Sequence, residues 1–100
     1  MDFKSFAEFY PYYLREHSDL MCRKLHFLGT CGVIALMILF FFTGNLLVLL
    51  FIPVMGYGLA WTGHFVFEKN RPATFKHPFY SLMGDFKMFW EILIGKLKAF

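Results

Sequence analysis

The chain has 100 residues, of which 58% are hydrophobic, and its formal net charge is +3. A soluble domain is typically about 45–50% apolar, so this composition disfavours a water-soluble domain. The charge is too small and too dispersed to indicate nucleic-acid binding, but it fits an anionic lipid surface. All Lys, Arg, Asp and Glu residues lie outside residues 25–66. We therefore predict a single membrane domain over residues 1–100.

The N-terminal segment, residues 1–17, is predicted to form an amphipathic helix. Its aromatic and apolar side chains recur at helical spacing, and most of its charged side chains lie off that stripe. Pro11 is expected to kink or restart the helix. Ser18 and Asp19 follow it, and both side chains can cap the start of a new helix. We therefore predict a turn at residues 18–19.

Two apolar runs, residues 25–42 and 46–66, follow this turn. Each is about 20 residues long, or roughly 30 Å as a helix, which is close to the hydrocarbon thickness of a bilayer. The residues between them, Thr43-Gly44-Asn45, are turn formers. Cations flank both outer ends of the pair and are absent from the turn, which favours cytoplasmic termini. The predicted fold is all-α: an integral membrane helical hairpin.

The C-terminal segment, residues 80–98, is predicted to form a second amphipathic helix on the cytoplasmic face. Its apolar residues recur every three or four positions. Such a helix can lie along the interface, pack against the hairpin or re-enter the bilayer. The hairpin would lie in the inner membrane of a bacterium or in the endoplasmic reticulum of a eukaryote. Cys22 and Cys31 are not expected to form a disulfide in a chain whose polar part faces the cytoplasm.

All four histidines fall near the same end of the predicted hairpin. His26 begins the first span and His64 ends the second, while His17 and His77 lie just outside. His17 and His26 are nine residues apart and would point to opposite sides of one continuous helix, so they can meet only across the turn at 18–19. Each histidine alone is adequately explained as an interfacial polar residue. Together they could form a metal site for zinc, copper or non-haem iron.

Two charged residues after the second span are candidates for roles at this site. Glu68 lies four residues after His64 and shares its helical face. It could be a metal ligand, an acceptor that orients a histidine, or an ion-pair partner for Lys69 or Arg71. Arg71 stands before Pro72, where the helix is expected to end, and could hold a carboxylate. A site at the bilayer surface suits an amphipathic substrate with its tail in lipid.

Two segments resemble a known family. The stretches "FYPYYLREHSDLMCRKLHFLGT" and "GHFVFEKNRPATFKHPFYSL" resemble the Mpo-like 2-hydroxy fatty acid dioxygenases, small membrane proteins whose fungal member acts in fatty acid α-oxidation. The motifs are a histidine nine residues before the histidine of a Leu-His pair, and Gly-His with Phe-Glu three residues on, then Arg-Pro-Ala.

The resemblance implies an Fe(II)-dependent enzyme that uses dioxygen to shorten a 2-hydroxy fatty acid by one carbon. It implies that His17, His26 and His64 bind the iron. Glu68 and Arg71 match the family's segment after these histidines, and we predict catalytic roles for both. His77 lies beyond the matching motifs and is included as a metal ligand because of its position. The expected partners are the fatty acid, dioxygen and membrane lipid; a homo-oligomer is left open.

Two other functions are compatible with the pattern. A non-catalytic hairpin with amphipathic flanks could shape a membrane or act as a scaffold, and its function would survive exchange of all four histidines. A metal transporter is disfavoured because the spans have no charged or strongly polar residue near their middle.

Overall fold

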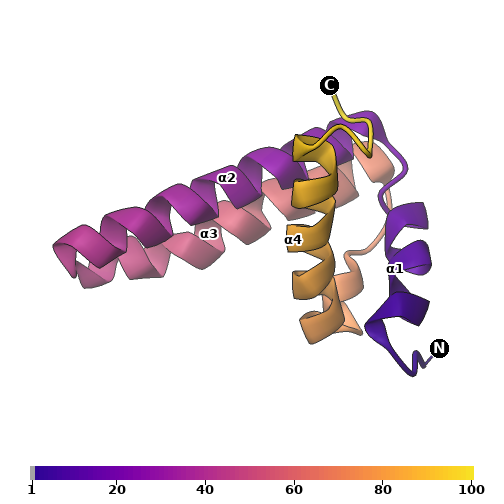
Figure 1. Cartoon of the computed structure of the whole chain (residues 1–100), viewed down its shortest axis with the longest axis horizontal. Coiled ribbons are helices and arrows are strands. Elements are labelled where there is room, and N and C mark those ends of the chain that lie inside the picture. Colours follow the sequence, from indigo (N-terminus) through magenta and orange to yellow (C-terminus); the bar gives the residue numbers. More distant parts are fainter. Residues whose placement is uncertain (1) are drawn as a thin grey trace.

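The computed structural model describes residues 2–100, and that part of the chain is helical without any strand. Figure 1 shows two long helices side by side, with the other elements and both termini gathered at the end away from the hairpin tip. The elements are α1 (Phe6–Arg15), α2 (Leu20–Thr43), α3 (Leu46–Thr62), the π-helical segment η1 (Gly63–Glu68), the 3₁₀ turn η2 (Ala73–Phe75) and α4 (Pro78–Leu93). The all-α hairpin predicted from the sequence is confirmed.

The break between α1 and α2 is made by helix caps. The Asp19 side chain accepts a hydrogen bond from the N–H of Cys22 at 3.0 Å and starts α2. The chain therefore turns at residues 18–19, as predicted. Pro11 neither ends nor restarts α1, which continues through it. Burial of the neighbouring Tyr10 and Tyr13 against α4 holds the helix together despite the missing N–H.

The tip of the hairpin uses the turn residues recognised in the sequence. Gly44 ends α2 with φ +63°, a left-handed conformation that glycine adopts without steric cost. The Asn45 side chain then accepts a hydrogen bond from the N–H of Leu47 at 2.9 Å and caps α3. Two helices can therefore follow one another with a two-residue connection.

The hairpin carries most of its apolar surface on the outside. Helix α2, with 24 residues, and the continuous helical segment Leu46–Glu68, with 23, are long and apolar enough to span a membrane. Near the tip, Phe41 and Phe42 are 81% and 78% exposed. The buried residues of the two helices lie near the opposite end, where α1 and α4 pack. The distal part of the hairpin is thus left without a protein covering.

The packed core lies between α1 and α4. Phe9, Tyr13 and Met88 are fully buried there. Helix α4 also contacts α2, where the rings of Phe27 and Phe89 stack with centroids 4.9 Å apart. Of the arrangements open to the C-terminal segment, the structure therefore has the one that packs against the hairpin. The helix begins at Pro78 and ends at Leu93, so it is shorter at its C-terminal end than the predicted 80–98 segment.

Candidate metal centre

Three histidines from three segments meet at the packed end of the hairpin. His17 follows α1, His26 lies in the second turn of α2 and His64 lies in η1. Each side chain is buried, with 1%, 4% and 2% exposure respectively. The Nε2 of His17 is 3.0 Å from that of His26 and 2.9 Å from that of His64. One ligand atom from each of the three lies within 4.8 Å of the others, so the group can bind a metal ion.

The other ring nitrogen of each histidine is held by an oxygen that can only accept. These contacts are His17 Nδ1 to the Tyr13 carbonyl at 2.6 Å, His26 Nδ1 to the Cys22 carbonyl at 2.8 Å, and His64 Nδ1 to Asn70 Oδ1 at 2.7 Å. Each Nδ1 must therefore carry the hydrogen, which leaves the Nε2 lone pair free in the neutral ring. Three lone pairs that face one another repel unless a cation lies between them.

Asn70 is a contributor to this site that sequence reasoning missed. Its Nδ2 donates to the carbonyl oxygen of Glu16 at 3.0 Å, which fixes the amide so that Oδ1 faces His64. Fixing the orientation and tautomer of a metal-binding histidine in this way is a common function of its neighbours. The sequence signals only a helix end at Asn70, because the contact with Glu16 depends on the fold.

The donor set fits a divalent transition metal. Imidazole nitrogens bind a divalent transition metal at about 2.0–2.1 Å, so nitrogens that share one ion must lie within about 4 Å of one another. The Nε2 of His17 lies within this limit of both others, at 3.0 Å from that of His26 and 2.9 Å from that of His64. Three neutral imidazoles leave further coordination positions free for small molecules, as in catalytic rather than structural metal sites. His17, His26 and His64 would hold such a metal through Nε2.

A glycine allows the two helices to approach at the site. A Cβ on Gly63 would lie 3.1 Å from both the Cα and the Sγ of Cys22, a distance tighter than ordinary van der Waals contact. The missing side chain therefore allows η1 to pack against the first turn of α2. That approach carries His64, the next residue, toward His26. The π-helical geometry of η1 is a feature often found at functional sites.

Glu68 acts on the turn between α1 and α2 rather than on a histidine. Its carboxylate accepts hydrogen bonds from the Ser18 hydroxyl at 2.8 Å and from the N–H of Asp19 at 2.7 Å. It shares a helical face with His64, as expected, but does not join the three-histidine group. Its carboxylate holds the turn that directly follows His17.

His77 and Arg71 also lie outside the three-histidine group. The His77 ring packs against Phe3 and Phe9, with centroids 5.2 and 5.4 Å apart, where it precedes α4. Arg71 is exposed, and its guanidinium lies 5.5 Å from the centre of the Phe75 ring. It lines an outer cavity of about 320 Å³ that is separate from the histidines. The structure thus brings together three of the four predicted ligands.

The pKa of His17 suits metal binding. Burial, reinforced by the neighbouring His26 and His64, lowers it well below the usual 6.5, so the ring stays neutral at pH 7. Tyr13 stacks on the His17 ring with centroids 3.9 Å apart, and its hydroxyl donates to Asp85. Burial raises the pKa of Tyr13 well above 10, so it remains a protonated donor. Tyr13 lies one helical turn before His17, a spacing that could have signalled this contact.

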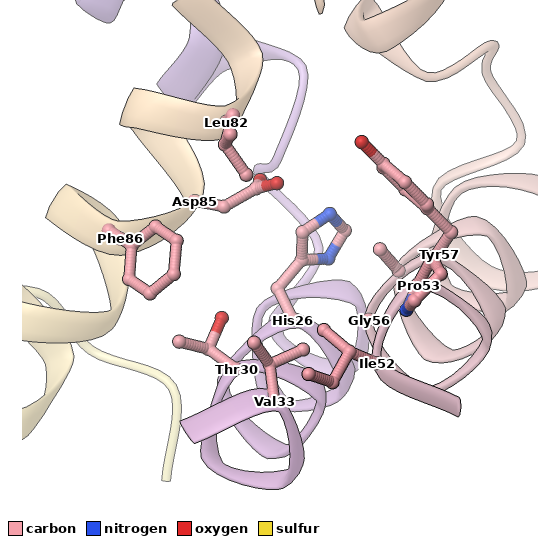
Figure 2. Close-up of a pocket in the computed structure, with 11 residues that line it drawn as sticks. His26, Thr30, Val33, Ile52, Pro53, Gly56, Tyr57, Leu82, Asp85 and Phe86 are labelled. Carbon is pink, nitrogen blue, oxygen red and sulfur yellow. The ribbon is translucent and has the colours of Figure 1, made fainter. Parts of the chain in front are cut away.

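An apolar cavity of about 230 Å³ opens beside His26, between α2, α3 and α4. Figure 2 shows the His26 ring with Asp85 of α4 on one side and Tyr57 of α3 on the other. The remaining lining is mostly apolar: Thr30, Val33, Ile52, Pro53, Gly56, Ala60, Leu82 and Phe86. A hydrocarbon chain can be accommodated there, with its end near the histidines.

Asp85 is expected to make the stability of the metal-free protein depend on pH. Burial raises its pKa from 3.8 to about 7, despite the opposing hydrogen bond from Tyr13. A raised folded-state pKa stabilises the fold below the unfolded pKa and loses that effect as the pH rises through 7. Relative to Asp85→Asn, the parent should therefore lose unfolding free energy between about pH 4 and 7, by on the order of 1 kcal/mol per unit of pKa shift, and its melting temperature should fall with it.

This prediction is measured by thermal unfolding in detergent with chelator, for both proteins across that pH range. Protonation of His17 lowers the stability of the fold as the pH falls below 6.5. This effect is common to both proteins, so it cancels in the difference between them. Parallel curves for parent and variant would show that Asp85 is not buried as described.

The fold and the site together define a class: helical proteins with two helices able to span a membrane by length and composition, and a buried histidine group that can bind a metal ion. Sequence comparison assigns the chain to one family within this class. The sequence model of the 2-hydroxy-palmitic acid dioxygenase Mpo1-like family matches residues 3–97, and the chain belongs to this family. Comparisons with curated proteins and with solved structures gave no match.

Proposed function

We propose that this protein is an Fe(II)-dependent dioxygenase of the membrane that shortens 2-hydroxy fatty acids by one carbon, the reaction of fatty acid α-oxidation. The observation that carries the proposal is the convergence of three unprotonated Nε2 atoms beside an apolar cavity. The description of the family supports the substrate class and the use of dioxygen.

The exposed apolar surface of the hairpin supports insertion in a membrane. A core helix of a soluble protein would be mostly buried, whereas only 17% and 11% of the two apolar windows are buried. The charge distribution supports cytoplasmic termini, because the tip between α2 and α3 carries no cation while Arg23, Lys24 and Lys69 lie at the opposite end. The inner membrane of a bacterium or the endoplasmic reticulum of a eukaryote fits this orientation.

The choice of iron rests on the reaction. Bound Fe(II) would supply the redox chemistry that dioxygen activation requires and that these side chains cannot supply. The protein's own residues would bind and orient: the apolar cavity takes the chain, and the neutral histidines, with Nδ1 fixed by Tyr13, Cys22 and Asn70, hold the ion.

The overall reaction balances with dioxygen as the oxidant. A 2-hydroxy acid and O₂ give the acid one carbon shorter, carbon dioxide and water. The bond between C1 and C2 breaks, C2 becomes the new carboxyl carbon, and the four electrons released reduce dioxygen. No further reductant is required.

The test uses 2-hydroxyhexadecanoic acid with detergent-solubilised protein that has been stripped of metal and reloaded. We expect pentadecanoic acid to form with Fe(II) but not with Zn(II), with one O₂ consumed per product. Equal product formation without metal, or no product with any metal, would contradict the proposal.

A further inference from the structure

Two buried donor groups belong to residues that line a small polar cavity beside the histidines. Among the buried side-chain nitrogen and oxygen atoms of residues 2–100, Trp61 Nε1 and Ser81 Oγ are the two without a hydrogen-bond partner. Ser81 is only 2% exposed. Both residues line a cavity of about 10 Å³, together with His17, His26 and His64. Buried polar atoms are nearly always paired, so two orphans in one cavity indicate a ligand.

The size and chemistry of the cavity define that ligand atom. A volume of about 10 Å³ is close to the space of one water-sized probe, so the cavity holds about one oxygen atom. The indole N–H of Trp61 can only donate, and the Ser81 hydroxyl can donate to the same acceptor. An acceptor oxygen is therefore the ligand atom that either group could bind.

The cavity lies next to the apolar one, with which it shares part of its lining. Both are lined by His26, Tyr57, Ala60 and Asp85. A molecule whose chain fills the 230 Å³ cavity would place its polar end at this junction. A long-chain carboxylate has the matching form, with an apolar tail and an acceptor oxygen at the end.

We propose that Trp61 Nε1–H and Ser81 Oγ–H bind one carboxylate oxygen of the fatty acid and so select acids over uncharged chains. The identity of the acid rests on the function proposed above. Trp61 is set for this role by its neighbours, because its ring packs against Tyr57 and Phe75 with centroids 5.5 and 5.2 Å apart. Ser81 is placed by the first turn of α4.

The test measures binding without turnover. Protein as purified is titrated under anaerobic conditions with 2-hydroxyhexadecanoic acid and with hexadecan-2-ol, which keeps the chain and the 2-hydroxyl but has a methyl group in place of the carboxylate. Trp61→Phe and Ser81→Ala should each weaken acid binding about tenfold, the loss expected for one hydrogen bond to a charged group, and leave binding of the alcohol unchanged. Trp90→Phe removes an indole from the exposed face of α4 and should change neither.

Two results would overturn the proposal. Unchanged acid binding in both variants would mean that the cavity holds only water, and equal loss for the acid and the alcohol would mean a structural role. Metal content, measured in the same samples, reports whether the histidine site is intact. A parent that binds the acid through these donors but does not shorten it would contradict only the dioxygenase function. If the parent shortens the acid and both variants bind the acid as tightly as the parent does, only the assignment of Trp61 and Ser81 would be wrong.

Discussion

Replacing His64 with alanine is expected to remove metal binding and the proposed chain-shortening activity while the helices remain. The variant loses one of three convergent Nε2 atoms, each about 3 Å from its neighbour. Changes in residues that merely orient a ligand already cost 10–100-fold in metal affinity, so loss of a ligand should cost about 100-fold or more. Metal per protein by elemental analysis and helicity by circular dichroism measure the two effects.

The matched control is His77→Ala. This ring packs against Phe3 and Phe9 and lies outside the three-histidine group. The variant should therefore retain metal and activity near the parent level. If His77→Ala lost metal as completely as His64→Ala, or if His64→Ala kept a full complement, the assignment of ligands would be wrong.

Glu68→Ala is expected to destabilise the fold by about 1–3 kcal/mol. The substitution removes the acceptor of the Ser18 hydroxyl and of the N–H of Asp19, which hold the turn between α1 and α2. Metal binding should weaken as well, because His17 directly precedes this turn. Thermal unfolding of the metal-free protein and metal titration measure the two losses.

Two further variants give this experiment its contrast. Glu68→Gln keeps an acceptor oxygen and should lose less stability, while Glu8→Ala, on the exposed side of α1, should change little. A catalytic carboxylate would behave differently: Glu68→Gln would abolish turnover with stability and metal content unchanged. That outcome would contradict the structural role assigned here and restore the catalytic role predicted from the sequence.

Local signals in the sequence explain which parts of the site could be foreseen. The turn that lets His17 meet His26 is marked by two capping residues, Ser18 and Asp19, and the hairpin by turn formers between two apolar runs. Helical spacing placed Glu68 on the face of His64. Each of these inferences depends on residues within a few positions of one another, where helical geometry decides the outcome.

Contacts between distant segments could not be read in this way. Asn70 orients His64 because its amide reaches the Glu16 carbonyl, 54 positions earlier, and Glu68 meets Ser18, 50 positions away. Both contacts exist only once η1 lies against the start of α2. From the sequence, a histidine, Lys69 or Arg71 was expected to be the protein partner of Glu68. In the fold its carboxylate instead contacts Ser18 and Asp19.

The burial of the histidines bears on the membrane-shaping alternative. A hairpin that acts only as a wedge needs apolar faces, and it gains nothing from three buried rings whose lone pairs face one another. Burying these lone pairs against one another costs free energy unless a cation lies between them. Exchange of all three histidines should therefore abolish function, whereas a wedge would tolerate it.

X-ray absorption spectroscopy of the metal, in protein purified without chelator, would show whether the three histidine Nε2 atoms bind one metal ion. We expect an ion with about three imidazole nitrogens at about 2.1 Å, together with oxygen ligands. Protein that carries no metal, or a metal bound without imidazole, would contradict this expectation.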